Sequence, residues 1–435
     1  MRFDRSIELG RRLHALVPGG AHTYAKGDDQ YPENMAPVIV RGEGCHVWDA
    51  DGNRFTEYGA GLRSVGLGHV FAPVVEAAQR QMAFGANFVR PATIELEAAE
   101  ALLSFVPNAD MVKFCKDGSD ATSGAVKLAR AYTGRDKVAI CASHPFFSVD
   151  DWFMGASGMP GGIPQATRDL TVKFNYNDLA SLEALFDQHA GQIAAVVLEA
   201  EKETAPAPGF LEGVRALCDR HGTVFVLDEM ITGFRWHNGG AQAFHGIRPD
   251  LSTFGKALAN GFSVSALAGR RELMRLGGAE HDRERVFLLS TTHGAETHAL
   301  AAAIATLKVY REEPVVATLW ARGERLARGL KAAAAAAGVA DHVPILGKPC
   351  CLVFGSRDEK GQPSQPFRTL LMQQLIEHGV LATSLVVNYS HSEADIDRTI
   401  EAFAAAFAVY RRALDEGIDK YLVGRPVKPA IRRFA

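Results

Sequence analysis

The chain has 435 residues, which is enough for a large domain and a smaller one. Hydrophobic residues make up 47% of the sequence and charged residues 22%, as in ordinary soluble enzymes. The net charge is −3 and no apolar stretch is long enough to span a bilayer, so neither nucleic acid nor a membrane is an expected partner.

A small antiparallel meander is predicted near the N-terminus. Short runs of β-branched and aromatic residues are separated there by the turn sequences Gly42-Glu43-Gly44 and Asp51-Gly52-Asn53. The predicted strands cover residues 38–40, 47–49 and 55–58, and helical periodicity follows over 73–84 and 94–106. We expect residues 1–70 to form an N-terminal segment that packs with a small C-terminal domain.

The middle of the chain, residues 71–309, alternates strands and helices and is expected to form the large domain. Strands are predicted over 112–114, 137–141, 193–198 and 224–227, and helices over 121–132, 182–189 and 210–221. The last two strands are almost unbroken apolar runs, which is typical of a parallel sheet covered on both faces. In such sheets, ligands gather beyond the carboxyl ends of the strands.

The pattern changes from residue 310 onward. Helices are predicted over 319–337 and 394–414, and strands over 352–354 and 380–382. Residues 310–435 are therefore expected to form a smaller α+β domain.

The cysteines and the first residues bear on the compartment. The six cysteines give neither a disulfide framework nor a metal-ligand spacing, and the fifteen histidines show no ligand spacing either. The N-terminal residues lack the apolar core of a secretory signal. We expect a cytoplasmic protein with no metal site.

The strongest local signal is the segment from Val226 to Arg235, in which Asp228 ends an apolar strand. A buried carboxylate needs a partner, and a protonated pyridine nitrogen would be one. Such an ion pair makes the pyridine ring a better electron sink. On this segment alone, an aspartate that only caps the next helix remains an alternative.

A second signal is Lys256, which lies among small and apolar residues with no acidic neighbour in sequence. Burial would lower the pKa of its amine and free it to form an imine with an aldehyde. A lone lysine is more often a solvated surface residue. However, the 28-residue separation from Asp228 allows one helix and one strand to bring the chain back to the same sheet edge.

A third signal is Gly118-Ser119, which opens a predicted helix. Backbone amides at a helix N-terminus can bind a phosphate, with glycine for close approach and serine for a hydroxyl. Serine and aspartate are also ordinary N-caps, so the motif is weak by itself. The segment 290–294, which contains Thr292, could add hydroxyl groups to the same phosphate.

Together, these motifs resemble the class III (fold type I) pyridoxal-phosphate (PLP) aminotransferases, most closely their glutamate-1-semialdehyde aminomutase branch. The resemblance spans nearly the whole chain and includes Pro18-Gly19-Gly20, Gly118-Ser119-Asp120-Ala121, 130–136, 228–235, Pro249-Asp250-Leu251 and Phe254-Gly255-Lys256. It implies an α/β PLP-transferase fold type I, in which a large domain with a mostly parallel seven-stranded sheet is joined to a smaller α+β domain.

The resemblance also implies roles for individual residues. Lys256 would be the Schiff-base lysine and proton shuttle, and Asp228 would hold the pyridine nitrogen. Gly118 and Ser119 would hold the phosphate, and Met230 would pack on one face of the ring. Thr292 would reach the phosphate of the neighbouring subunit, which makes a homodimer the expected active unit.

The chain departs from the family pattern near the cofactor. The family usually has Tyr-His-Gly where this chain has the segment 143–147, so Phe146 is the expected stacking ring, with a neighbouring residue as the alternative. The Glu-Pro pair of the family is replaced by Glu199-Ala200-Glu201, and we expect Glu201 to contact substrate.

A further departure concerns the substrate. Where aminomutases supply an arginine for a carboxylate, this chain has Lys26, which lacks the bidentate geometry of a guanidinium. His22, Tyr24 and Lys26 are expected to bind substrate, as is Arg63, with Arg90 as a further candidate for an anion contact. This loop resembles that of aminotransferases in amino-sugar and polysaccharide biosynthesis.

The predicted function is therefore amino transfer from an amino acid, glutamate first, to a carbonyl of a sugar or keto-sugar acid, as in the formation of 8-amino-3,8-dideoxy-octulosonate. One alternative is the aminomutase reaction, which moves the amino group within one substrate. Other PLP reactions, such as racemisation or decarboxylation, use the same scaffold. A non-catalytic PLP-binding protein is a further alternative.

Overall fold

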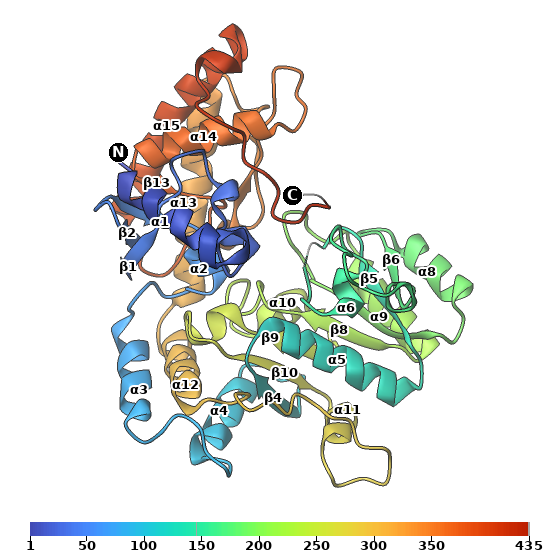
Figure 1. Ribbon diagram of the computed structural model, residues 1–435. Helices are drawn as coiled ribbons and strands as arrows, with labels where there is room; N and C mark the ends of the chain where they lie inside the picture. Colours follow the sequence, from blue (N-terminus) through green and yellow to red (C-terminus); the bar gives the residue numbers. More distant parts are fainter. Residues whose placement is uncertain (145, 434–435) are drawn as a thin grey trace. The chain divides into compact units, whose positions relative to one another are not determined.

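The computed structural model describes residues 1–144 and 146–433 and separates the chain into two compact units (Figure 1). Unit 1 comprises Met1–Leu62, Leu67–Phe71 and Ala317–Ala435, and unit 2 comprises Arg63–Gly66 and Ala72–Val316. No helix in the described part of the chain has the length and hydropathy that a bilayer crossing needs.

Unit 2 is built on a seven-stranded sheet with the order β4-β10-β9-β8-β7-β5-β6. Its strands are β4 (Met111–Cys115), β5 (Lys137–Cys141), β6 (Thr171–Phe174), β7 (Ile193–Leu198), β8 (Val224–Asp228), β9 (Leu251–Phe254) and β10 (Ser265–Gly269). The pairings from β9 to β6 are parallel, whereas β10 pairs antiparallel with both β9 and β4. The predicted mostly parallel sheet of seven strands is confirmed. The sequence pattern alone does not predict β6 and β10, which are only four and five residues long, and it indicates β9 only through the spacing of Asp228 and Lys256.

Helices cover both faces of this sheet, which explains the unbroken apolar strands. The helices of unit 2 are α3 (Ala72–Met82), α4 (Thr93–Leu103), α5 (Gly118–Thr133), α6 (Asp151–Met154), α7 (Gln165–Arg168), α8 (Leu179–Gln188), α9 (Phe210–His221), α10 (Gly240–His245), α11 (Arg271–Met274) and α12 (Thr297–Glu312). Val224 and Val226 pack in one core cluster with α5, whereas Phe225 and Leu227 pack in another with α8 and α9. Successive strand residues point to opposite faces, so a strand covered on both sides must be apolar throughout.

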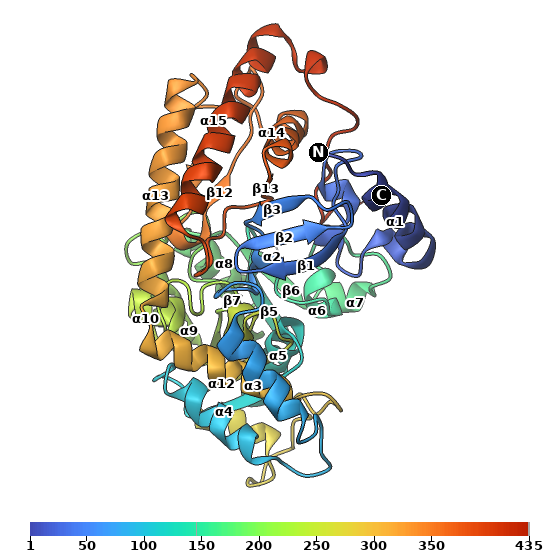
Figure 2. The ribbon, with the colours of Figure 1, turned by 90° about the vertical axis from the view of Figure 1, so that its left-hand side faces the viewer.

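Two further features of unit 2 are visible in the ribbons. Figure 1 shows α5 crossing the sheet, where it packs on β7 to β10. Figure 2 shows α3, α4 and α12 side by side, and α12 packs on both of the other two helices. Two short 3-10 turns, η4 (Lys256–Ala259) and η5 (Arg275–Gly277), complete the unit.

Unit 1 joins the two ends of the chain in one four-stranded sheet, ordered β1-β2-β3-β13. The strands are β1 (Ile39–Glu43), β2 (His46–Asp49), β3 (Arg54–Glu57) and β13 (Val380–Leu381), and a second pair is formed by β11 (Ile345–Leu346) and β12 (Val353–Phe354). The first three strands form the predicted antiparallel meander. β13 then pairs parallel with β3, which no local pattern indicates.

The helices of unit 1 pack around a core of their own. They are α1 (Asp4–Leu16), α2 (Ala60–Arg63), α13 (Val315–Ala336), α14 (Gln365–Glu377) and α15 (Glu393–Glu416), with the 3-10 turns η1 (Pro18–Gly20), η2 (Tyr24–Lys26), η3 (Asp28–Gln30), η6 (Pro349–Cys351) and η7 (Ile418–Lys420). Leu326 of α13, Leu371 of α14 and Phe403 of α15 belong to one buried cluster. The sequence pattern did not indicate α1 or α14.

Candidate active site

Asp228 and Lys256 lie at the carboxyl ends of neighbouring parallel strands in unit 2. β8 ends at Asp228, which is in register with Thr253 of β9, and Lys256 follows two residues after the end of that strand. The intervening chain contains α10 and β9, the predicted helix and strand. Parallel pairing therefore brings the two residues to one edge of the sheet, where open α/β sheets bind ligands.

The Asp228 carboxyl is buried, with 2% of its surface exposed. Its Oδ1 accepts hydrogen bonds from the Met230 backbone N–H (2.8 Å) and from the Thr253 hydroxyl (3.3 Å). Burial raises the pKa of Asp228, and the Lys256 charge opposes that rise. A cation beside this carboxyl would therefore be stabilised by it.

Burial also lowers the pKa of the Lys256 amine, while Asp228 and Glu199 raise it. A lowered pKa increases the share of neutral amine, the form that reacts with an aldehyde. Lys256 has a φ of +48°, an unusual conformation for a residue other than glycine. Such backbone strain concentrates at functional sites.

Met230 joins the three predicted motifs in space. A Cβ added to Gly118 would lie 2.9 Å from the Met230 sulfur, and one added to Gly255 would lie 2.7 Å from the same atom. Glycine at both positions therefore lets Met230 fit between them in this conformation. The side chain after Asp228 thus lies against both the start of α5 and the residue before Lys256.

The N-terminus of α5 has the features of an anion site. Asp117 caps it by accepting a hydrogen bond from Asp120 N–H (3.1 Å), and Ser119 Oγ accepts one from Val149 N–H (3.1 Å). The first amides of a helix have no partner within the helix and carry partial positive charge. Gly118 and Ser119 supply two of these amides.

The segment with Thr292 is anchored near this helix start. Lys116, at the end of β4, forms an ion pair with Glu296, and Asn87 donates a hydrogen bond to the Thr292 carbonyl (2.9 Å). The Thr292 side chain is exposed. Whether it reaches the phosphate of a second subunit stays a prediction.

Glu199 is a site residue that the sequence analysis did not select. It directly follows β7, and its N–H donates to Nδ1 of the buried His144 (3.1 Å). Its Oε2 is buried without a hydrogen-bond partner among the described residues. Burial and the Asp228 charge raise the pKa of Glu199, while Lys202, Lys256 and Arg63 lower it. Its position in the sequence could have identified Glu199, since an acid that directly follows an apolar parallel strand lies at the same sheet edge as Asp228.

Glu201 has different surroundings from those expected of a substrate ligand. It is 2% exposed, and it accepts hydrogen bonds from Trp236 Nε1 (3.1 Å) and His245 Nε2 (3.2 Å). The carboxyl is thus held by side chains of unit 2. Of the two glutamates, it is Glu199, two residues earlier, that acts on Lys256 together with Asp228.

Arg63 lies in an unusual backbone segment. Ala60, Gly61, Leu62 and Arg63 all have positive φ, between +46° and +71°, so α2 is a left-handed turn. Non-glycine residues in this region cost about 1–3 kcal/mol each, so the surroundings must hold the turn in place. Arg235, which is fully buried, donates to the Arg63 carbonyl. The Arg63 charge lowers the pKa of both Lys256 and Glu199, as expected of a cation beside them.

The aromatic residues after β5 are placed as follows. Phe146 is 43% exposed and its ring lies edge-on to Phe153 at 5.8 Å. Phe147 is buried in the core cluster that includes Phe153. Phe146 is thus the ring that is free to cover a ligand, and its stacking role stays a prediction.

The predicted substrate residues His22, Tyr24 and Lys26 belong to unit 1 and are exposed. The loop that carries them is fixed through its acidic end. His14 contacts Asp28 (3.0 Å), and Arg432 forms an ion pair with Asp29 (2.6 Å). The structure orders this loop without using the three side chains, and their role stays a prediction. Arg90, in unit 2, is exposed as well.

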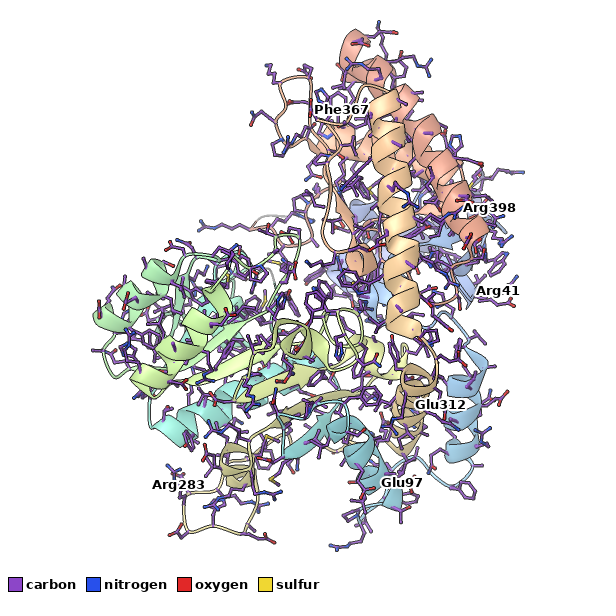
Figure 3. The ribbon with its side chains drawn as sticks, turned by 180° about the vertical axis from the view of Figure 1, so that it is seen from behind. Arg41, Glu97, Arg283, Glu312, Phe367 and Arg398 are labelled. Atoms are coloured by element: carbon purple, nitrogen blue, oxygen red, sulfur yellow. The ribbon has the colours of Figure 1, made fainter. Side chains whose placement is uncertain are left out.

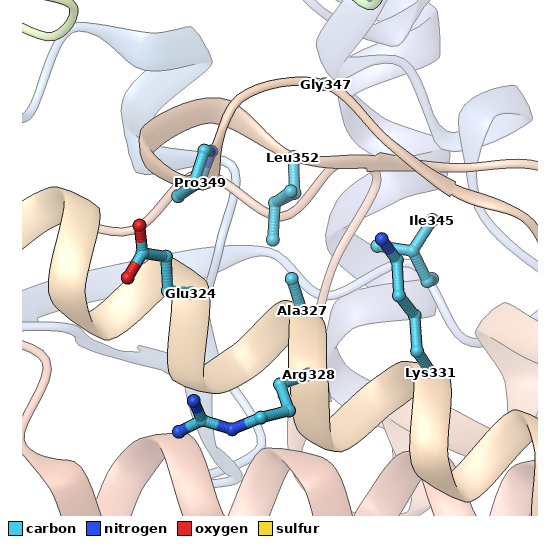
Figure 4. A pocket seen from close by; sticks show the side chains of 8 residues that line it. All are labelled: Glu324, Ala327, Arg328, Lys331, Ile345, Gly347, Pro349 and Leu352. Carbon is cyan, nitrogen blue, oxygen red and sulfur yellow. The ribbon is translucent and has the colours of Figure 1, made fainter.

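A hollow of about 420 Å³ in unit 1 is separate from these residues. Glu324, Arg328 and Lys331 of α13 line one side, and Pro349 and Leu352 lie opposite (Figure 4). None of the predicted site residues lines it.

Comparisons with known proteins agree with this arrangement. The family model described as Aminotransferase class-III matches residues 28–407. The chain is 32% identical to the glutamate-1-semialdehyde 2,1-aminomutase of Syntrophobacter fumaroxidans, over 94% of this chain and 98% of that protein. It is 33% identical to the same-named protein of Desulforudis audaxviator, over 93% and 97% respectively.

A solved structure with a similar fold is the PLP internal aldimine form of the FumI protein from Sphingopyxis sp. MTA144. Its TM-score is 0.86 at 28% identity, with 95% of this chain and 98% of that one covered. An omega-transaminase from Sphaerobacter thermophilus has a TM-score of 0.84 at 26% identity, over 93% and 97%. The fold of this chain is therefore that of PLP fold type I.

The residues at the sheet edge fit PLP. The buried Asp228 suits a pyridinium nitrogen, the start of α5 suits a phosphate, and the enclosed amine of Lys256 suits an aldehyde. The chain belongs to the class III aminotransferase family and is a PLP-dependent enzyme.

Proposed function

We propose that this enzyme transfers an amino group from glutamate to a carbonyl of a sugar or keto-sugar acid. The observation that carries the transfer chemistry is the enclosed Lys256 amine beside Asp228, at the sheet edge where Met230 contacts Gly118. The balance is simple: glutamate becomes 2-oxoglutarate, and the acceptor carbonyl becomes an amine.

PLP, when bound, supplies the aldehyde and the electron sink. Lys256 would bond to that aldehyde and afterwards move a proton at the carbon that loses or gains nitrogen. Asp228 would keep the pyridine nitrogen protonated. Gly118 and Ser119 would hold the phosphate, while Met230 and Phe146 would enclose the ring.

The substrate proposal depends on Arg63 and, separately, on side chains of the loop over residues 22–26. Arg63 acts electrostatically on Lys256 and is suited to a carboxylate common to amino donors. His22, Tyr24 and Lys26 are exposed on an ordered loop and suit the hydroxyl and carboxylate groups of a sugar acid. Lys26 provides a point charge and cannot form the two parallel hydrogen bonds of an arginine side chain with a carboxylate. This difference suits an acid other than the aminomutase substrate. Glu201 would contribute to substrate binding by holding Trp236 in place through its hydrogen bond with the indole nitrogen.

A homodimer in which Thr292 contacts the partner's phosphate is part of this proposal. Exposed apolar side chains accompany the Thr292 segment. They are Phe84 (76% exposed), Phe88 (50%), Val89 (100%) and Phe287 (70%). The Gly85 and Ala86 carbonyls accept hydrogen bonds from Thr297, so the two segments are joined. Exposed apolar patches of this kind mark protein interfaces.

The proposed compartment is the cytoplasm. All six cysteines are buried, and none forms a disulfide within the described part of the chain. Reduced cysteines are the usual state in that compartment.

The second candidate is the glutamate-1-semialdehyde aminomutase reaction, which the names of the curated relatives favour. It differs from the first in that it needs no amino donor and releases no 2-oxoglutarate. The two candidates can therefore be separated by one product.

The test uses purified holoenzyme with glutamate and a panel of sugar aldehydes, including the acceptor for 8-amino-3,8-dideoxy-octulosonate. We expect 2-oxoglutarate and an aminated sugar in equal amounts. Turnover of glutamate-1-semialdehyde alone, with no 2-oxoglutarate from any acceptor, would replace the proposal by the aminomutase. If neither glutamate nor glutamate-1-semialdehyde changes the cofactor absorbance, both candidate reactions are excluded.

A matched variant tests the loop. Lys26→Ala should raise the KM of the sugar acceptor roughly tenfold, as for the loss of a single charged contact. The first half-reaction with glutamate should stay unchanged. If Lys26→Ala impairs both half-reactions equally, Lys26 does not act specifically on the acceptor.

A further inference from the structure

Three potential metal ligands meet in unit 1, away from the residues assigned above. They are Cys45, His46 at the start of β2, and Asp395 in the first turn of α15. The sulfur of Cys45 lies 3.6 Å from His46 Nε2, which lies 3.4 Å from Asp395 Oδ1. All three ligand atoms lie within 4.8 Å of one another.

These distances fit one tetrahedral ion. Zinc bonds of about 2.3 Å to sulfur and about 2.0–2.1 Å to nitrogen or oxygen, at tetrahedral angles, place sulfur and nitrogen about 3.6 Å apart and nitrogen and oxygen about 3.3 Å apart. The observed 3.6 Å and 3.4 Å match both values. Both neighbours face Nε2 of His46, and the Cys45 thiol also lies within hydrogen-bond reach of the Asp395 carboxyl.

The chemistry of the three groups also favours a cation. A thiolate and a carboxylate together balance the two charges of a divalent ion, and the mixture of sulfur, nitrogen and oxygen ligands suits zinc. Burial lowers the pKa of His46, while Asp395 raises it. Burial and the nearby Asp395 raise the pKa of the Cys45 thiol to about 12, so an ion must displace the thiol proton in order to bind.

A fourth polar group next to this cluster has an unused nitrogen. His391 is fully buried, and its Nε2 has no hydrogen-bond partner among the residues described. Its Nδ1 is held by Asn388. Burial lowers the pKa of His391 to about 3. Asp395 raises this pKa and His46 lowers it, so the charges of both residues act on the ring. A buried nitrogen without a partner is costly unless a ligand satisfies it.

Several contacts compete with a metal at this place. Asp395 completes the capping box of α15, in which Ser392 is the N-cap, and its Oδ2 accepts from the Ser392 N–H (2.9 Å) and hydroxyl (2.6 Å). Arg398, labelled on α15 in Figure 3, donates to Oδ1. The Arg54 charge also acts on His46. These guanidinium groups oppose a cation, so the affinity should be below that of a structural site with four ligands.

We propose that Cys45, His46 and Asp395 form a zinc site that ties β2 to the start of α15. The fourth position would be open to water. This inference departs from the expectation that the protein has no metal site, because Asp395 is far from Cys45 in sequence. It is independent of the transfer reaction.

The test measures zinc bound to the holoenzyme. The protein is incubated with zinc chloride, desalted and analysed by mass spectrometry of metals, together with Cys45→Ser, His46→Gln and the control Cys218→Ser. We expect a single zinc ion per chain in the wild type and in Cys218→Ser, and its loss in the other two variants. Zinc should also raise the melting temperature of the wild type by roughly 3 °C or more, but not that of Cys45→Ser.

A second measurement on the wild type guards against unfolding of the variants. Cobalt in place of zinc should give the visible bands of tetrahedral cobalt with a thiolate ligand, at longer wavelengths than the cofactor absorbs. Absence of these bands and of bound zinc in the wild type would overturn the proposal. Equal zinc in the wild type and Cys45→Ser would also overturn it, because the ion would then be bound elsewhere, for example at the cofactor.

Discussion

Glu199 and Glu229 are two buried glutamates that follow neighbouring strands, yet their surroundings are opposite. Glu229 accepts hydrogen bonds from the Thr232 hydroxyl, from Ala241 N–H (2.8 Å) and from Gln242 N–H (2.8 Å). Glu199 has a buried Oε2 without a described partner, and it acts electrostatically on Lys256. Burial raises the pKa of both carboxyls.

The difference separates a structural acid from one that belongs to a site. The bonds to Glu229 fix the chain between β8 and α10, and Gly240 is close enough that an added Cβ would lie 2.6 Å from the carboxyl. Glu199 instead shares its surroundings with Asp228, Lys256 and Arg63. Satisfied buried groups hold a fold together, whereas an unsatisfied one marks a place for a ligand.

The largest expected effect comes from removing the Lys256 amine, on which Asp228, Glu199 and Arg63 act electrostatically. Lys256→Ala should lower turnover by roughly 10³-fold or more, because both the nucleophile and the proton carrier are lost. PLP should still bind noncovalently through the start of α5 and Asp228. Steady-state kinetics and the cofactor absorbance check this, and turnover near the wild-type rate would mean that another group carries the proton.

A smaller loss is expected for Asp228→Asn. The amide cannot balance a charged pyridine nitrogen, and a hydrogen bond to a charged group contributes about 1.5–3 kcal/mol, which corresponds to roughly 10- to 100-fold in rate. The bond between Lys256 and the cofactor should persist in the absorbance spectrum. Unchanged kcat would show that the nitrogen is held by another group.

The paired variants Glu229→Gln and Glu199→Gln test the comparison directly. Glu229→Gln should lower the free energy of unfolding by about 1–3 kcal/mol, because at least one buried donor loses its acceptor. Glu199→Gln should leave stability nearly unchanged. It should instead move the acidic limb of the rate profile to lower pH, because Glu199 raises the pKa of Lys256. If Glu199→Gln unfolds the protein and Glu229→Gln changes the rate profile, the assignment is reversed.

The smallest effect concerns the pH dependence of stability. Burial raises the pKa of Glu229 from 4.5 to about 7. The folded state therefore binds more protons at this group than the unfolded state between these two values, so its contribution to stability is present at low pH and is lost as the pH rises towards 7. Urea titrations across this range should show the loss in the wild type and a weaker one in Glu229→Gln. The same slope in both would assign the titration to another group.

Some of the site follows from local patterns. Unbroken apolar runs predict buried parallel strands, and parallel strands share one ligand-binding edge. That reasoning placed Asp228 and Lys256 together, and their parallel neighbouring strands confirm it. Short strands with polar residues, such as β6, were not predictable, because their burial depends on neighbours that are distant in sequence.

Other parts required the tertiary structure. Glu199 and Glu201 are two residues apart, and only the course of the chain beyond β7 decides that the first acts on Lys256 while Trp236 and His245 hold the second. The left-handed turn at Arg63 is likewise imposed by its surroundings, since no local preference favours it.

By itself, the sequence predicted the longer apolar strands of the sheet, because periodicity is a local property, and its motifs carried the resemblance that implies the chemistry at Lys256. Tertiary structure alone decided the pairing of β3 with β13 and the meeting of Cys45 with Asp395. The physical reason is that such contacts join segments more than 300 residues apart, and only packing of the whole unit brings them together.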